Sequence, residues 1–408
     1  MAAPILKPPY APPKEKPMAS TSPGKRFLAR EMPAEIEVAK VQGSFVFDTE
    51  NKQYIDFIMG WCVGNFGWGN PALTEKAKQF NGPDYVYPGY AYPPWDELAG
   101  LLASIAPGKL KTCFRATGGS EAVDIALQAA MVHTGRQKFV SLEGSYHGNT
   151  IGALSVGSSE YREACRNLLA RCYKIKPPLG ATSLDRVEKL LQREDVAAFI
   201  MEPISINLGV LIPERQFMTG LAKLCKKYGT LLIMDEVATG FGRTGTLFAC
   251  EQFNLEPDIL CMAKAITGGL GGMGAAIMTP AIARSMEDRG NFYSTYGWHP
   301  RSVNVAIATV QYLIENQIRL LDNVAAMSGY FDERLAHMAF KETPELRIAG
   351  LAIGVDVHDK AYASRVQAKC RRAGLLLTAE GSTLLILPAL DIDQRIAGQG
   401  LDILESCV

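Results

Sequence analysis

The sequence predicts an α/β fold in which a mostly parallel mixed sheet is sandwiched by helices in a large domain, next to a smaller α+β domain built from both chain ends. Three observations support this. The chain has 408 residues, 48% of them hydrophobic, which is enough to bury a large core. Between about residues 110 and 280, short apolar runs alternate with amphipathic stretches, as in βαβ units. After about residue 305, long helical periodicity replaces this alternation.

The elements follow in order along the chain. Seven of the 23 prolines lie in the first 23 residues, which excludes a helix or a central strand there. A β-hairpin is expected at 45–48 and 54–57. The large domain should have strands at 138–142, 197–201, 230–234 and 259–262, and helices at 120–133, 184–192 and 217–228. Two helices should follow at 303–315 and 321–340, and then short strands near 346–357 and 383–387 with a helix between them.

The same pattern divides the chain into four segments. We expect a proline-rich arm at 1–24, the N-terminal part of the small domain at 25–58, the large domain at 59–305 and the C-terminal part of the small domain at 306–408. The large domain is therefore predicted to be an insertion between the two parts of the small one.

Composition excludes several classes of function. Lys plus Arg and Asp plus Glu both number 42, so the balanced charge disfavours nucleic acid and anionic membranes as partners. Nine cysteines without a C-x-x-C pair and five histidines without a cluster predict reduced thiols, a cytoplasmic location and no metal site. The uncharged run 265–283 contains five glycines and Pro280, so a buried loop and a short strand are expected there instead of a membrane span.

Chemically active side chains follow the predicted strands. Glu202 follows one strand, Asp235 the next and Lys264 a third, while Tyr146 and His147 come shortly after the strand at 138–142. Ligands of such sheets bind at the carboxyl ends of the strands. Upstream, the turn at 117–121 opens a helix whose free N–H groups suit a phosphate. A phosphate-binding turn, an amine and a carboxylate together fit pyridoxal phosphate. Its aldehyde needs a lysine, and its ring nitrogen needs an acid.

Two glycine-rich segments suggest an alternative interpretation, a dinucleotide-binding enzyme. The patterns at 240–245 and 269–274 both match G-x-G-x-x-G. Neither forms a tight strand-to-helix turn, because five residues separate Met234 from the first run and a strand-like segment follows the second. The dinucleotide interpretation is therefore disfavoured.

With these residues assembled, the sequence resembles the class III aminotransferases, the ω-aminotransferase branch of the fold-type-I pyridoxal phosphate enzymes. The likeness spans about residues 40 to 390. It is carried by Asp56-Phe57 through Pro71, by Phe114 through Ala122, by the Tyr-His-Gly run at 146–148, by the D-E-V-x-T-G-F-G-R-T-G run at 235–245, by Lys264, and by the segment 295–300. Six matching segments in the same order are highly specific.

The resemblance implies a role for each matched residue. Lys264 would form the Schiff base with pyridoxal 5'-phosphate and then transfer a proton, and Asp235 would pair with the ring N–H. Tyr146 would stack on the front of the ring and Val237 would pack behind it. Glu202 would brace Asp235 or the nearby edge of the ring, and His147 would contact the cofactor. Backbone N–H groups of Gly119 and Ser120 would bind the phosphate, and Thr295 would reach the phosphate of a neighbouring subunit, which implies a homodimer with shared active sites. Trp61, Tyr87 and Tyr90 would line the substrate pocket.

Two departures from the family pattern bear on the substrate. Members that use 2-oxoglutarate usually carry a Glu where this chain has Asn207 and an Arg where it has Leu385. The joint loss is consistent, because a single unpaired charge in a dry site would cost roughly 3–5 kcal/mol. A replacement guanidinium could come from Arg115, Arg243, Arg371 or Arg372.

The sequence therefore predicts a pyridoxal phosphate-dependent aminotransferase. It would move an amino group from an amine or amino acid to an oxo acid by a ping-pong mechanism, with pyruvate favoured over 2-oxoglutarate. Two alternatives remain open: an aminomutase of the glutamate-1-semialdehyde type, and a catalytically silent binding protein on the same fold. Consumption of a second oxo acid separates the aminotransferase from the aminomutase.

Overall fold

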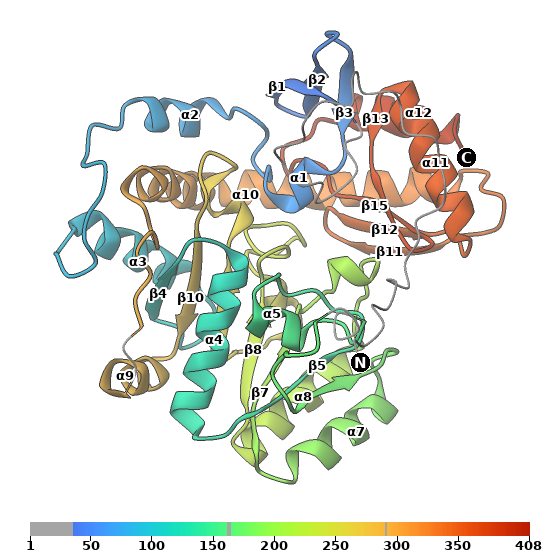
Figure 1. The fold of residues 1–408 in the computed structure, drawn as a ribbon. Coiled ribbons are helices and arrows are strands. Elements are labelled where there is room, and N and C mark those ends of the chain that lie inside the picture. Colours follow the sequence, from blue (N-terminus) through green and yellow to red (C-terminus); the bar gives the residue numbers. More distant parts are fainter. Residues whose placement is uncertain (1–35, 161–164, 290–291) are drawn as a thin grey trace, which may run out of the picture.

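The computed structural model describes residues 36–160, 165–289 and 292–408 (Figure 1). The proline-rich arm expected at 1–24 lies outside the described residues. Within the described ranges, no helix is both long enough and apolar enough to cross a membrane.

A seven-stranded sheet forms the centre of the molecule. Its strand order is β4 (Thr112–Ala116), β10 (Gly274–Met278), β9 (Ile259–Met262), β8 (Leu231–Asp235), β7 (Val196–Met201), β5 (Lys138–Leu142) and β6 (Cys172–Ile175). Only β10 runs antiparallel to its neighbours β4 and β9, and the other pairs are parallel. This confirms the predicted mostly parallel mixed sheet.

Helices cover both faces of this sheet. Neighbouring strand residues point to opposite faces, so Ile233 joins the core beneath α4 (Gly119–Thr134), α5 (Ile151–Val156) and α9 (Pro280–Arg289), while Met234 faces α7 (Ala181–Leu191) and α8 (Arg215–Tyr228). The core that contains Met234 extends to α3 (Pro93–Ile105). The strands are apolar on both faces because both faces are covered, which is why they read as continuous apolar runs in the sequence.

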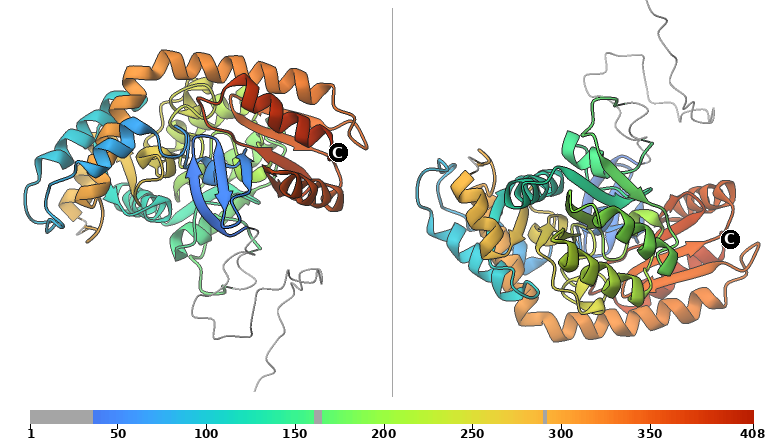
Figure 2. Two further views of the ribbon diagram at one scale, coloured as in Figure 1. Left: turned by 90° about the horizontal axis from the view of Figure 1, so that it is seen from above. Right: turned by 90° about the horizontal axis from the view of Figure 1, so that it is seen from below.

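The N-terminal strands of the described chain join a C-terminal strand in the first of two smaller sheets (Figures 1 and 2). The first joins β1 (Val38–Gln42), β2 (Phe45–Asp48), β3 (Gln53–Asp56) and β13 (Leu375–Leu376), the last of which lies parallel to β3. The second has the order β11 (Glu345–Ala349), β12 (Ala352–Asp356), β15 (Thr383–Ile386) and β14 (Thr378–Glu380). Helices α11 (Lys360–Ala373) and α12 (Gln394–Glu405) accompany them.

One helix spans both parts of the molecule, and it corrects the prediction of two helices at 303–315 and 321–340. Helix α10 (Pro300–Ala336) is continuous over 37 residues and runs along the outer edge in Figure 2. Residues 316–320 contain neither glycine nor proline, so nothing interrupts the backbone hydrogen bonds there. Leu320 is buried while Ile318 is exposed, so the amphipathic pattern continues through the segment. Near its start α10 contacts α2 (Pro71–Lys78), and further along it contacts α12.

Candidate active site

Asp235 and His147 connect two strand ends at the carboxyl edge of the central sheet. Asp235 is the last residue of β8, and its Oδ2 lies 2.7 Å from Nδ1 of His147, in the loop that follows β5. The Oδ1 of Asp235 accepts the N–H of Val237 at 3.1 Å. Both side chains are buried. These two contacts hold the carboxylate in one orientation.

Glu202 lies on the neighbouring strand end. In the parallel β7–β8 pair Met201 is opposite Met234, so the residues that follow them, Glu202 and Asp235, are also neighbours. Burial and then the Asp235 carboxylate raise the pKa of Glu202 to about 8, against the opposing influence of Lys264 and of the N–H of Ile206. Oε1 of Glu202 has no hydrogen-bond partner among the described residues.

Lys264 completes the group of charged side chains. Cys261 pairs with Asp235 across β8 and β9, and Lys264 opens the short helix η3 (Lys264–Thr267) three residues later. Its charge acts on Glu202, so the amine and the two carboxylates belong to one site. The backbone of Lys264 has φ 46°, a left-handed conformation that is rare outside glycine and that concentrates at functional sites.

The turn before α4 offers free backbone N–H groups. Helix α4 begins at Gly119 after Gly118, and no side chain caps it. A Cβ at Gly119 would lie 3.0 Å from Cγ1 of Val237, and one at Gly148 would lie 2.2 Å from Oγ of Ser120. The turn therefore packs tightly against both the segment after Asp235 and the loop that carries His147. An anion bound at these N–H groups would face the positive end of the helix dipole.

The aromatic side chains are placed differently. Tyr146 is 38% exposed, and burial together with the charge of Asp235 raises its pKa, so it lies at the open side of the site near Asp235. Tyr87 and Tyr90 contact each other with ring centroids 5.3 Å apart and are more exposed still. Thr295 is also exposed. Within a single chain, these last three residues lie at the surface.

A left-handed turn that the sequence analysis did not predict carries Trp61. In α1 (Met59–Cys62) all four residues have positive φ, between 47° and 67°. Asp56 holds the turn, since its Oδ1 accepts the N–H groups of Ile58 and Met59 and its Oδ2 accepts the indole N–H of Trp68, each at 2.8 Å. A buried aspartate before a glycine-containing turn was the available signal.

Comparison with known proteins decides the family. The family model described as aminotransferase class-III matches residues 27–408. The chain belongs to the class-III aminotransferase family. An acetylornithine aminotransferase of Methanosarcina mazei is 36% identical over 90% of both chains, and one of Archaeoglobus fulgidus is 35% identical over 90% of this chain and 94% of its own.

Solved structures agree with this assignment. The taurine:2-oxoglutarate aminotransferase of Bifidobacterium kashiwanohense, in complex with PLP and glutamate, is 27% identical with a TM-score of 0.86 over 94% of both chains. A PLP-bound amine transaminase from an uncultivated Pseudomonas species is 26% identical with a TM-score of 0.83, over 96% of this chain and 100% of its own. The chain is therefore a PLP-dependent aminotransferase, as the sequence predicted.

The residues of this aminotransferase fit pyridoxal phosphate on structural grounds. The uncapped helix start suits the phosphate, and the clamped carboxylate of Asp235 suits a ring N–H. Nε2 of His147 and Oε1 of Glu202 are buried without partners in the described part of the chain, as polar atoms that face a ligand site would be. Among the described residues, no group of His, Cys, Asp and Glu could hold a metal ion.

The four arginines that the sequence analysis named as candidates for binding a substrate carboxylate differ in burial and in hydrogen bonding. The Arg243 guanidinium is fully buried and donates to Oδ1 of Asn65 and to the carbonyls of Leu351 and Pro388, so it joins the two parts of the aminotransferase. Arg371 and Arg372 lie in the last turn of α11. The Arg115 guanidinium stacks 3.7 Å from the Trp95 ring centroid, and its Nη1 has no partner in the ranges that the structure describes.

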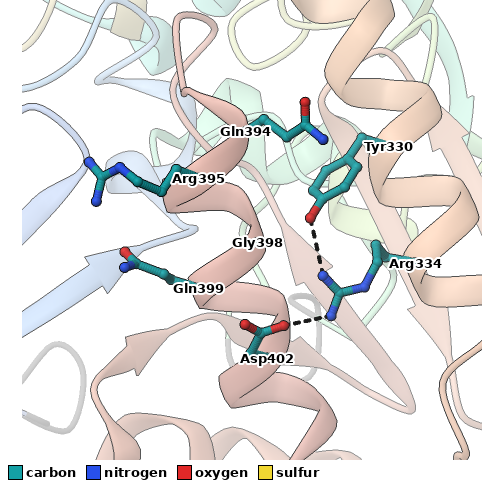
Figure 3. A pocket seen from close by; sticks show the side chains of 7 residues that line it. All are labelled: Tyr330, Arg334, Gln394, Arg395, Gly398, Gln399 and Asp402. Atoms are coloured by element: carbon teal, nitrogen blue, oxygen red, sulfur yellow. Dashed lines mark hydrogen bonds and ion pairs between the residues drawn. The ribbon is translucent and has the colours of Figure 1, made fainter.

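A surface groove between α10 and α12 lies in the small-sheet region of the aminotransferase (Figure 3). Its Arg334 donates to Asp402 at 2.7 Å, to Glu405 at 3.2 Å and to the Tyr330 hydroxyl at 3.1 Å. Because these partners already occupy the guanidinium, the groove offers little to an anionic ligand.

Proposed function

We propose that the enzyme transfers an amino group from an amine or amino acid to a small oxo acid, with pyruvate favoured over 2-oxoglutarate, by a ping-pong mechanism. The observation that carries the acceptor preference is the pair Asn207 and Leu385. Leu385 is fully buried in β15, opposite Gly354. Asn207, in η1 (Ile206–Leu208), donates its amide N–H to the carbonyl of Gly144 at 3.2 Å. Neither residue brings a charge that could alternately pair with and release a dicarboxylate.

Lys264 and Asp235 carry the proposed chemistry. When bound, pyridoxal phosphate supplies an aldehyde that captures amines and a ring that withdraws electrons from the substrate carbon. Nζ of Lys264 would hold the cofactor through its aldehyde and would move the proton at the substrate carbon. The Asp235 carboxylate is held by His147 and the Val237 N–H, and it would accept the ring N–H of the cofactor.

The surrounding residues hold the cofactor in place. The N–H groups of Gly119 and Ser120 would bind the phosphate, and Tyr146 and Val237 would pack against the ring. Because the amino group stays on the enzyme between two half-reactions, the first product leaves before the acceptor binds. This is the physical reason for a ping-pong mechanism.

We also propose a homodimer in which Thr295 reaches the partner's phosphate. Exposed tyrosines flank Thr295 in the sequence: Tyr293 is 61% and Tyr296 64% exposed, and the ring centroids of Tyr296 and Tyr85 lie 5.8 Å apart. Exposed aromatic patches of this kind mark protein interfaces. In light scattering we expect a dimer, and Tyr296→Glu should weaken dimerisation and cofactor binding together. A fully active monomer would contradict this.

The acceptor preference is tested by the second half-reaction. The amino-loaded enzyme is mixed with pyruvate or with 2-oxoglutarate, and the return of the visible absorbance band is followed by stopped flow. We expect pyruvate to restore it faster. N-acetylornithine and simple amines are compared as donors, because the archaeal relatives are named acetylornithine aminotransferases. Efficient return with 2-oxoglutarate and none with pyruvate would overturn the preference, and conversion without any second oxo acid would indicate an aminomutase.

The cytoplasmic location also stays a prediction. It rests on nine cysteines spaced without a disulfide or metal pattern. Detection of the tagged protein in a fraction other than the cytoplasm would contradict it.

A further inference from the structure

The carboxyl group of Glu202 lies next to Asp235, and the reaction proposed above does not say whether it carries a proton. It follows β7, between the strand that ends in Asp235 and the strand that leads to His147. The side chain is 5% exposed, and its Oε1 has no hydrogen-bond partner in the described ranges. An ionised carboxylate is costly in such surroundings, whereas a neutral acid is tolerated.

Charged groups face Glu202 from several elements. Asp235 and Glu236, at the end of β8, both oppose its ionisation. Lys264, in η3, and the N–H of Ile206, in η1, favour its ionisation. Burial outweighs these favourable contacts and raises the pKa of Glu202 to about 8.

Asp235 is the better place for a negative charge. Its carboxylate accepts two hydrogen bonds, one from the Val237 N–H and one from His147, as an ionised carboxylate does. Glu202 accepts from the Ile206 N–H and leaves its other oxygen unpaired. Two adjacent buried carboxyls share one negative charge, so the proton stays on Glu202.

We propose that Glu202 is a positioning residue that holds a proton beside Asp235, so that Asp235 alone carries the negative charge facing the cofactor ring. This inference rests on the proposed role of Asp235. When Glu202 releases its proton, a second negative charge appears beside Asp235, at the part of the site that faces the cofactor ring. The protonation of Glu202 therefore sets the pH above which the site changes its charge.

Infrared difference spectra test the protonation directly. Spectra of the protein labelled with ¹³C-glutamate are recorded at about pH 7 and about pH 9, with and without pyridoxal phosphate. We expect the carbonyl band of a neutral glutamic acid at the lower pH and its loss at the higher pH. Glu202→Gln should lack this change. Glu143→Gln is the matched control, because Glu143 follows the nearby β5 but is only partly buried and accepts from Ser159, which lowers its pKa; it should show the wild-type change.

Absorbance titration of the holoenzyme supplies the second readout. In wild type and in Glu143→Gln, we expect the visible band to titrate with an extra step that Glu202→Gln lacks. Identical titrations in all three proteins, or no neutral glutamic acid band in wild type, would overturn the inference while leaving the aminotransferase proposal intact. Failure of the wild type to bind pyridoxal phosphate would instead refute the proposed function. If Glu202→Gln does not fold, absence of the band from labelled wild type still overturns the inference, and Glu236→Gln assigns a band that is present, because burial also raises the pKa of Glu236.

Discussion

Nδ1 of His147 lies 2.7 Å from Oδ2 of Asp235, and both side chains are buried. An ionised carboxylate only accepts hydrogen bonds, so Nδ1 carries the proton in this contact. The other ring nitrogen, Nε2, is buried without a partner in the described part of the chain. His147 therefore acts through Asp235, and it connects the loop after β5 to the end of β8.

Removing this donor should weaken cofactor binding. In His147→Ala, Asp235 keeps only the Val237 N–H, and the loss of a hydrogen bond to a charged group costs about 1.5–3 kcal/mol, or roughly 10-fold to 100-fold in the Kd for pyridoxal phosphate. His147→Asn places an amide N–H near the former Nδ1 and should recover most of the affinity. Fluorescence titration of the apoenzyme measures both. Equal affinities of the two variants would show that the hydrogen bond contributes little.

Cofactor binding should also depend on the close contact between Gly148 and Ser120. A Cβ at Gly148, where φ is 124°, would lie 2.2 Å from Oγ and 2.8 Å from Cα of Ser120. Gly148→Ala should therefore displace the phosphate-binding turn and raise the cofactor Kd at least roughly 10-fold. Gly135→Ala is the control, since φ is also positive there (70°) but no atom lies within 4 Å of the added methyl. It should lower the free energy of unfolding by about 1 kcal/mol and leave cofactor binding unchanged.

The sequence predicted the elements on which the central charges sit. Continuous apolar runs mark strands covered on both faces, so the strands before Glu202, Asp235 and Lys264 were found to within a residue or two. Adjacent parallel strands bring their carboxyl ends to one edge, and that rule alone places Asp235 near Lys264. Local sequence carries this information because each strand is short and bounded by turn residues.

Other features depend on contacts that are distant in the sequence. Residues 316–320 are helical because Leu320 is buried in the core beneath α10, which periodicity over a short window did not detect. Arg243 was a candidate for binding substrate, but it is enclosed by carbonyls of Leu351 and Pro388 from the other part of the chain. The left-handed turn at Trp61 needs the side chain of Asp56, and no propensity favours three non-glycine residues with positive φ.

Glu202 should make stability depend on pH. Its pKa is about 8 in the folded protein against an ordinary value of 4.5, so the folded state binds the proton more tightly than the unfolded state. The contribution to stability is complete below about pH 4.5 and is lost as pH rises towards 8. The free energy of unfolding of the apoenzyme, relative to Glu202→Gln, should therefore fall over this range in urea denaturation. A constant difference would show that the folded and unfolded pKa values are alike.

The last prediction concerns the turn that presents Trp61. Each non-glycine residue with positive φ stores strain of order 1–3 kcal/mol, and three occur in succession around Gly60. The carboxylate of Asp56 offsets this strain by accepting three hydrogen bonds. In Asp56→Asn, the amide N–H groups would oppose the indole N–H of Trp68, at a cost of about 1–3 kcal/mol in the free energy of unfolding.

A double-mutant cycle separates this effect from general damage. Trp68→Phe removes the opposing N–H, so Asp56→Asn should cost less in that background than in wild type, by about 1 kcal/mol. If Trp61 lines the substrate pocket, as the family resemblance implies, Asp56→Asn should also raise KM for an aromatic amine more than for a small aliphatic amine, with a smaller effect on kcat. If the changes in the free energy of unfolding of the two single variants add up to that of the double variant, the side chains of Asp56 and Trp68 are not energetically coupled. Equal changes in KM for the two amines would instead show that the turn lies outside the substrate pocket. A turn that contacts the substrate should affect the binding of the larger amine more than that of the smaller one.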